Sequence, residues 1–382
     1  MFPPMMLSRH MSIRQPNTKK KTPVTINIES PVSEEVIKSI PTFCFPDDMK
    51  IECYKPESKV HYLVLTDMSG DNTYATCVTF YRPFIVEKRH KYSDIMVIME
   101  RDSDSDDSDQ SPEDDQSNIY MSLDTAYGNL KFGAKRCYIP HCCVLISKHP
   151  YFSVMKDCLS SMVHKVEEDP EGMTQCVKQF AHVLTMTPVP PAGNVAIEFN
   201  ISVNEFTLYP PESADRPVVD IPLHLVFLCF QDDEIFKILS AMLVEERIVF
   251  LSSNFALLFI VMESFRYFIL PFTWSSRFTY VPVLPAKSLE LLEAPGTFMM
   301  GCHAIHKKEV EQVEGLVIVD IDAGTVTMNQ NSDLYEEALS NGHSEGTADI
   351  FDIPNIPVEA AKVFSSVCKR ARYQYDIADS QR

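Results

Sequence analysis

The chain has 382 residues, of which 45% are hydrophobic and 23% are charged, and its 34 basic against 53 acidic residues give a formal net charge of -19. This length is enough for two or three domains with buried cores. The acidic excess would repel a polyanion and argues against nucleic acid as a partner, whereas it suits basic protein surfaces.

The first part of the chain is predicted to be a flexible arm followed by a β-hairpin. Residues 1–38 are polar and interrupted by prolines, a composition typical of disordered segments. The character of the chain changes at Pro41, where the run TFCFP follows. The runs HYLVLTDMSG and TYATCVTFYRPF meet at residues 70–72, Gly-Asp-Asn, which indicates a hairpin. Because apolar residues are consecutive in both runs, we expect both faces of these strands to be covered.

An acidic stretch, residues 101–118, interrupts this first domain. Its high charge and lack of apolar periodicity predict a disordered insertion. Ser103 and Ser111 each have an aspartate three residues further on, Asp106 and Asp114, a pattern that suits an acid-directed kinase. Both serines are therefore candidate phosphorylation sites, where phosphate would add negative charge. The alternative is a passive, solvated loop.

The middle of the chain alternates strand and helix patterns, which predicts an α/β core. YIPHCCVLISK is a predicted strand, apolar residues at helical spacing follow it, and a second helix over residues 173–186 precedes a strand pair. Asp232 and Asp233 stand where a helix N-cap is expected, ahead of an apolar helix. RIVFLSS after that helix is a predicted buried strand.

The most hydrophobic run, residues 254–272, carries Glu263 and Arg266 in its middle. A membrane span rarely accepts both charges, so we expect a buried core helix and no transmembrane segment. The eleven cysteines include no Cys-x-x-Cys pair, which predicts reduced thiols and a cytoplasmic protein rather than a disulfide framework.

The last region begins with EGLVIVDIDAGTVTM, a predicted hairpin with an Asp-Ala-Gly turn. A helix is expected after the prolines of IPNIPVEAAKVF. The chain is expected to stop before a full third core is built.

No catalytic motif is found in the sequence. Residues 296–303, GTFMMGCH, have the glycine spacing of a phosphate-binding loop but lack its Lys and Ser/Thr, so a turn is predicted there. Cys142 and His141 cannot act as nucleophile and base, because neighbours on a strand point to opposite faces. We therefore expect no catalytic residue, no cofactor and no metal.

Several segments resemble the DENN domain family, in the family's own order. PTFCFPDD with HYLVLTDMSGDNTYATCVTFYRPF is similar to the family's upstream lobe, and this resemblance implies that FCFP is a strand ahead of the paired hairpin. CYIPHCCVLISKHPYFSVMKDCLSSM and LHLVFLCFQDDEIFKILSAMLVEERIVFLSS resemble its central lobe. ILPFTWSSRFTYVPVLPAKSLELLEAPGTFMMGCH resembles the family's most recognisable stretch. The resemblance spans about residues 40–370.

The resemblance implies an α/β architecture of three lobes. A longin-like upstream lobe is expected over residues 39–135, with the insertion 101–118 inside it. The central DENN lobe is expected over 136–308, and a short, incomplete downstream lobe over 309–382. The DENN motifs themselves are mostly fold-forming residues.

The function implied by the resemblance is guanine-nucleotide exchange on a Rab GTPase in vesicle trafficking, without a cofactor or a covalent step. The first two lobes would share a surface that favours the open, nucleotide-free GTPase. The protein would then be cytoplasmic and peripheral on vesicle or endosomal membranes. The alternative is a DENN-type scaffold that binds small GTPases or signalling kinases without exchange.

The candidate Rab contacts are residues expected at the ends of elements, where chains reach the surface. Tyr81 and Arg82 are expected to end the upstream hairpin, and Asp232 and Asp233 to begin the core helix. Simple helix capping is the alternative role for the two aspartates.

Overall fold

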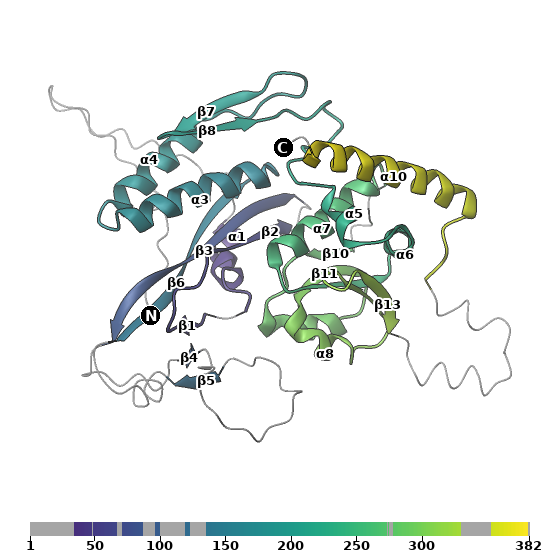
Figure 1. Ribbon diagram of the computed structural model, residues 1–382, viewed down its shortest axis with the longest axis horizontal. Helices are drawn as coiled ribbons and strands as arrows, with labels where there is room; N and C mark the ends of the chain where they lie inside the picture. Colours follow the sequence, from purple (N-terminus) through teal and green to yellow (C-terminus); the bar gives the residue numbers. More distant parts are fainter. Residues whose placement is uncertain are drawn as a thin grey trace.

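A computed structural model describes residues 34–47, 49–66, 71–86, 96–99, 119–122, 135–272, 274, 278–329 and 353–380. The described residues form two large sheets and one two-stranded sheet, with helices around them, so the predicted α/β class is confirmed (Figure 1). Helix α7 (Phe255–Phe268) lies between the two large sheets and packs against both.

The first sheet has six strands, in the order β2-β3-β6-β1-β4-β5. Their bounds are β1 Ile51–Glu52, β2 Lys59–Thr66, β3 Asn72–Val86, β4 Met96–Met99, β5 Ile119–Ser122 and β6 Lys135–Ser147. The predicted β2–β3 hairpin is confirmed, and β6 pairs antiparallel with β3 along its whole length. The lobe boundary at residue 135 stays a prediction, but hydrogen bonding places β6 in the hairpin's sheet.

Both faces of this sheet are covered, as predicted from its consecutive apolar residues. One face packs on α3 (Phe152–Glu168) and α4 (Met173–Met186), where Val78 and Phe80 meet Cys158 and Leu159. The hairpin of β7 (Ile197–Ile201) and β8 (Asn204–Leu208) joins this layer. The other face carries Leu63 and packs against the second half of the molecule.

The second sheet has the order β10-β11-β9-β12-β13. Its strands are β9 Arg247–Ser252, β10 Thr279–Val281, β11 Phe298–His303, β12 Leu316–Asp320 and β13 Thr325–Asn329. The first four strands are parallel and β13 is antiparallel to β12. The helices around it are α5 Leu225–Cys229, α6 Asp232–Leu243, α7 Phe255–Phe268, η1 Ala286–Glu293, η2 Ala304–His306, α8 Lys307–Val310 and α10 Val358–Ser380.

Helix α7 is buried between the two sheets, which explains why its sequence is apolar on all sides. Leu258, Met262 and Phe265 pack in the core of the second sheet, whereas Phe259 packs with Tyr62 of β2. The Asn254 side chain caps this helix by accepting hydrogen bonds from two backbone N–H groups. The prediction of a core helix is confirmed, and none of the described helices is long and apolar enough to cross a membrane.

The N-terminal segment differs from its prediction. Residues 34–38, assigned to the flexible arm, are part of helix α1 (Glu34–Phe43). The run TFCFP is not a strand, because Phe43 ends this helix and Cys44–Asp47 form a turn. Burial of Ile40 and Cys44 stabilises the helix despite Pro41 inside it.

The segment GTFMMGCH is also not a turn, because Phe298–His303 is strand β11 in the second sheet. A side chain at Gly301 would collide with the Pro282 carbonyl oxygen, only 2.2 Å from an added Cβ. The glycine is therefore needed for close backbone packing rather than for phosphate binding.

The regions expected to form the third lobe complete the second sheet instead of standing apart. Strand β12 pairs with β9, and the predicted Asp-Ala-Gly turn leads into β13, as expected. Helix α10 packs on α6 through a Phe236–Phe364 contact with ring centroids 5.9 Å apart. The acidic insertion lies outside the described residues, but the strands on either side of it, β4 and β5, pair with each other.

Helix α3 receives its N-terminal cap from a distant segment. Its own N-cap residue, Tyr151, makes no side-chain capping bond, and the Asp220 carboxylate instead accepts a 3.1 Å hydrogen bond from the Val154 N–H. Burial raises the pKa of Asp220 to about 6, although the bonds from Val154 and Ser153 oppose this.

We predict that Asp220 destabilises the fold increasingly as pH rises. The pKa of Asp220 is higher in the folded chain than in the unfolded chain, so the folded chain binds the proton more tightly. The free energy of unfolding therefore falls as pH rises from about 4 to 6 and Asp220 becomes ionised. In Asp220→Asn the amide oxygen still accepts the Val154 bond. Relative to the parent chain, the variant should gain about 1–2 kcal/mol of unfolding free energy from pH 4.5 to pH 7, measured in urea. The control is Asp233→Asn, since Asp233 is exposed. If both variants showed the same change of unfolding free energy with pH, the raised pKa of Asp220 would be contradicted.

Candidate functional site

The predicted contact residues Tyr81 and Arg82 do not end a strand. Both lie within β3, where they pair with Pro140 and Ile139 of β6. Tyr81 is 7% exposed, and the Arg82 guanidinium lies 3.9 Å from the Met173 sulfur of α4. The prediction that they form an exposed strand end is wrong, because β3 continues to Val86.

Asp232 and Asp233 lie in the first turn of α6, as predicted, but neither is its N-cap. Gln231 takes that position without a side-chain bond. The Asp232 carboxylate is bound by Arg372 of α10 at 2.6 Å, and Arg372 also donates to the Phe227 and Phe230 carbonyls. Asp232 therefore holds α10 in place, whereas Asp233 is exposed.

The structure does not bring the two predicted pairs into one site, since β3 and α6 belong to different halves of the molecule (Figure 1). Ser103 and Ser111 lie outside the described residues, so their phosphorylation stays a prediction. In the described part of the chain, no group of three or more His, Cys, Asp or Glu side chains could hold a metal ion.

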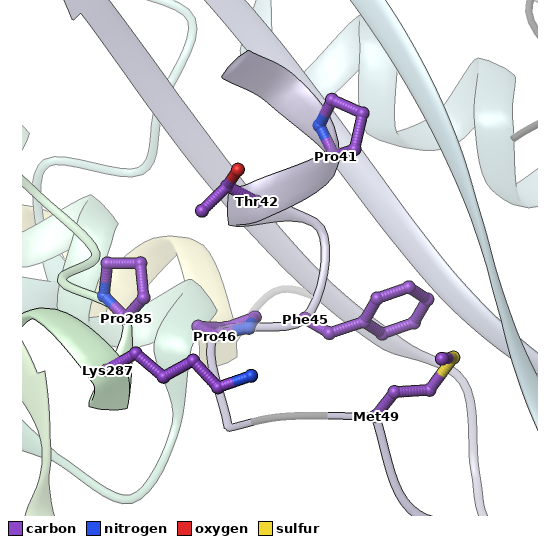
Figure 2. Close-up of a pocket in the computed structure, with 7 residues that line it drawn as sticks. All are labelled: Pro41, Thr42, Phe45, Pro46, Met49, Pro285 and Lys287. Atoms are coloured by element: carbon purple, nitrogen blue, oxygen red, sulfur yellow. The ribbon is translucent and has the colours of Figure 1, made fainter. Parts of the chain in front are cut away.

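A groove between the two halves is the strongest candidate site. It has a volume of about 190 Å³ and is mostly apolar. One wall comes from the end of α1 and the segment after it, and the other from the start of η1 (Figure 2). The lining residues are Pro41, Thr42, Phe45, Pro46, Met49, Pro285 and Lys287.

The two walls are held together by direct bonds. The Ala286 N–H donates to the Pro46 carbonyl at 2.9 Å, which fixes the turn after α1 to η1. The His303 Nε2 lies 4.0 Å from the Asp47 carboxylate, and the His303 ring contacts the Phe255 ring with centroids 5.1 Å apart. The groove is therefore a fixed joint between the two sheets.

A buried histidine supports the turn from below. The Nε2 of His61 on β2 is hydrogen-bonded at 3.0 Å to the carbonyl oxygen of Phe43, the last residue of α1. Burial lowers the pKa of His61, more than the Phe43 carbonyl and Cys44 raise it. A neutral ring that donates to this carbonyl is the consistent state near neutral pH.

The surface of the groove is suited to binding an apolar side chain. Met49 is 63% exposed at its mouth, Phe45 is half-buried, and the prolines give rigid walls. Lys287 adds a positive charge at the edge. Apolar pockets of this kind can receive the anchor side chains of a protein partner.

Sequence reasoning missed this groove. The family resemblance implies a strand at FCFP and includes Pro285 only as part of a motif. An available signal was the rigid, apolar run of prolines and aromatics directly before Asp47 and Asp48. The partner wall lies far away in sequence, so no local pattern could join the two.

Comparison with known proteins agrees with this two-sheet architecture. Residues 138–324 match the family model of the DENN (AEX-3) domain, and residues 16–80 match that of the uDENN domain. The chain belongs to the DENN domain family. The DENN match covers α7 and all but the last strand of the second sheet, and the uDENN match ends within β3.

Relatives of this chain among characterised proteins include the following three. DENN domain-containing protein 3 of Mus musculus is 31% identical over 352 residues, which cover 88% of this chain and 23% of the relative. The DENN domain and WD repeat-containing protein SCD1 of Arabidopsis thaliana is 26% identical over 193 residues, 50% of this chain and 16% of the relative. Elicitor of plant defense protein 1 of Fusarium odoratissimum is 28% identical over 158 residues, which cover 41% of this chain and 17% of the relative. This chain therefore spans less than a quarter of the length of these relatives.

Proposed function

We propose that this chain is a guanine-nucleotide exchange factor that binds a Rab GTPase across the groove between its two sheets. Membership of the DENN family supports the activity, and the groove supports the location. A GTPase that contacts both walls at once would be held in one orientation. Preferential binding of its nucleotide-free form would speed GDP release without any bond chemistry by this chain.

The groove carries this proposal because the two family-matched segments supply its walls. Pro41 and Pro46 lie in the uDENN match, and Pro285 and Lys287 in the DENN match. Asp233, exposed at the start of α6, is a second proposed contact, whereas Asp232 is already bound by Arg372. The Rab would be met on a vesicle or endosomal membrane, where this chain acts peripherally.

The direct test is release of fluorescent GDP from a panel of purified Rab proteins. We predict that at least one Rab releases GDP faster in the presence of excess unlabelled nucleotide, and that the chain itself consumes none. The isolated, nucleotide-free complex should be stable on gel filtration and dissociate when GDP is added. Stoichiometric binding without faster release from any Rab would favour the scaffold instead.

A further inference from the structure

The segment between α4 and β7 is rich in proline and is extended. Residues 187–192, TPVPPA, are termed the proline strap. Each of residues 187–191 is either a proline or the residue before one, and both positions favour extended backbone over helix. Thr187 accordingly has φ -78° and ψ 118°. These angles are close to those of a polyproline II helix, for which φ is about -75° and ψ about 145°.

Burial along the proline strap repeats every three residues. Pro190 is buried, and Thr187 and Gly193, three residues away on either side, are half-buried. The residues in between are all exposed: Pro188, Val189, Pro191 and Ala192. A polyproline II helix has three residues per turn, so a period of three places one edge of the strap against the protein and leaves two edges in solvent.

The proline strap is fixed at both ends. At its start, the Thr187 N–H and hydroxyl donate to the Val183 carbonyl of α4, at 3.0 Å and 2.9 Å. Beyond its end, the Gly193 N–H donates to the Pro211 carbonyl at 3.0 Å. Gly193 has φ 131°, a conformation that glycine adopts far more readily than other residues. The strap is therefore preorganised, so a partner that binds it loses little affinity to the ordering of a flexible segment.

The sequence around the proline strap is uncharged, and its exposed residues are partly apolar. Residues 183–197 contain no Asp, Glu, Lys or Arg. Met186 and Val195, on either side of the strap, are 71% and 64% exposed. Tyr209 is exposed as well and lies at the same end of the β7–β8 hairpin as Val195. Exposed apolar surface that extends over several neighbouring residues is typical of a protein interaction site.

We propose that the proline strap is a docking site for a protein domain whose aromatic-lined groove binds polyproline II helices. Pro188 and Pro191 have the P-x-x-P spacing that such grooves bind, and they share one exposed edge of the strap. Val189 and Ala192 form the second exposed edge. Because the flanking sequence carries no charge, the affinity comes from apolar packing rather than from ion pairs.

This docking site is separate from the groove between the two large sheets. The strap joins α4 to β7 in the layer that covers one face of the first sheet (Figure 1). None of the strap residues lines the groove. Binding at the strap is therefore independent of the proposed function.

The test applies the whole chain, carrying a fluorescent label, to an array of purified SH3, WW and EVH1 domains at low and at high salt. At least one domain should bind the chain equally well at both salt concentrations, because the strap and its flanks are uncharged. The variant Pro188→Ala/Pro191→Ala should bind that domain roughly tenfold or more weakly. The control Pro217→Ala removes an exposed proline outside the strap and should bind as the parent chain does.

A second variant guards against loss of the fold in the double proline variant. Val189→Asp keeps all three prolines and places a charge on an exposed edge of the strap, so it should also bind roughly tenfold or more weakly. If no domain on the array binds the parent chain more strongly than Val189→Asp, the proposal is overturned. Binding that disappears at high salt would overturn it too, because the net charge of -19 would then account for the interaction.

Discussion

Replacing Arg266 with Met should lower the free energy of unfolding by about 3 kcal/mol. The Arg266 guanidinium binds the Glu263 carboxylate at 3.0 Å and lies over the Tyr280 ring, 4.4 Å from its centroid. Tyr280 also donates a 2.8 Å hydrogen bond to Glu263. The Glu263 side chain is only 5% exposed, so loss of Arg266 leaves a buried charge without its counterion.

The pKa shifts agree with a tightly coupled cluster. Burial alone would lower the pKa of Arg266, but Glu263 and Tyr280 more than offset this and raise it. Burial, followed by the Glu263 charge, raises the pKa of Tyr280. Tyr280 also packs against the cluster that holds Tyr62 and Phe152. The Arg266, Glu263 and Tyr280 side chains therefore stabilise the contact between the two large sheets.

Urea unfolding followed by fluorescence measures this effect, with Arg216→Met as a matched control. Arg216 pairs with Glu212 in an i,i+4 arrangement, but its side chain is 66% exposed, so the control should change stability by less than about 0.5 kcal/mol. The double variant Glu263→Met/Arg266→Met should recover part of the loss, because no unpaired charge remains buried. Equal stability of the Arg266 and Arg216 variants would contradict the assignment.

Replacing Met49 with Asp should slow Rab-directed GDP release roughly tenfold or more while the fold is retained. Because Met49 is 63% exposed, the change removes little buried surface and should leave thermal unfolding within about a degree or two. A partner side chain that enters the groove would then meet a carboxylate in an apolar setting, which is costly to desolvate.

Met186→Asp is the matched control for this prediction. Met186 is 71% exposed at the end of α4, so the same replacement adds the same charge on an element that does not line the groove. Its GDP release should equal that of the parent chain. If both variants lose activity to the same extent, net charge rather than the groove would be the cause.

Much of the fold follows from local patterns. The run 254–272 is apolar on all sides because α7 is covered by both sheets, and residues 173–186 form the predicted helix without a shift of either end. The hairpins β2–β3 and β12–β13 were visible because apolar runs flank short polar turns. Trp274, in the family's most recognisable stretch, has a structural role, since it stacks on Phe278 and donates to the Met242 carbonyl.

The parts that could not be predicted depend on contacts between distant segments. The family resemblance implies a strand at FCFP, but Phe43 ends a helix and packs against Leu63 and Cys77 of the first sheet. Asp232 is a residue type that commonly caps a helix N-terminus, yet its carboxylate binds Arg372, which is 140 residues further along the chain. The groove is missed for the same reason, because its walls meet only after both sheets have formed.

Photo-cross-linking from position 49 would test most directly whether a GTPase binds across the groove. A photoreactive residue replaces Met49 in the nucleotide-free complex with a Rab that responds in the release assay, and a second variant carries it at Val203. Val203 is 90% exposed between β7 and β8, away from the groove. We expect cross-links from position 49 to the switch regions of the Rab and none from position 203. Cross-links from position 203 alone, in a complex that still accelerates GDP release, would contradict binding at the groove.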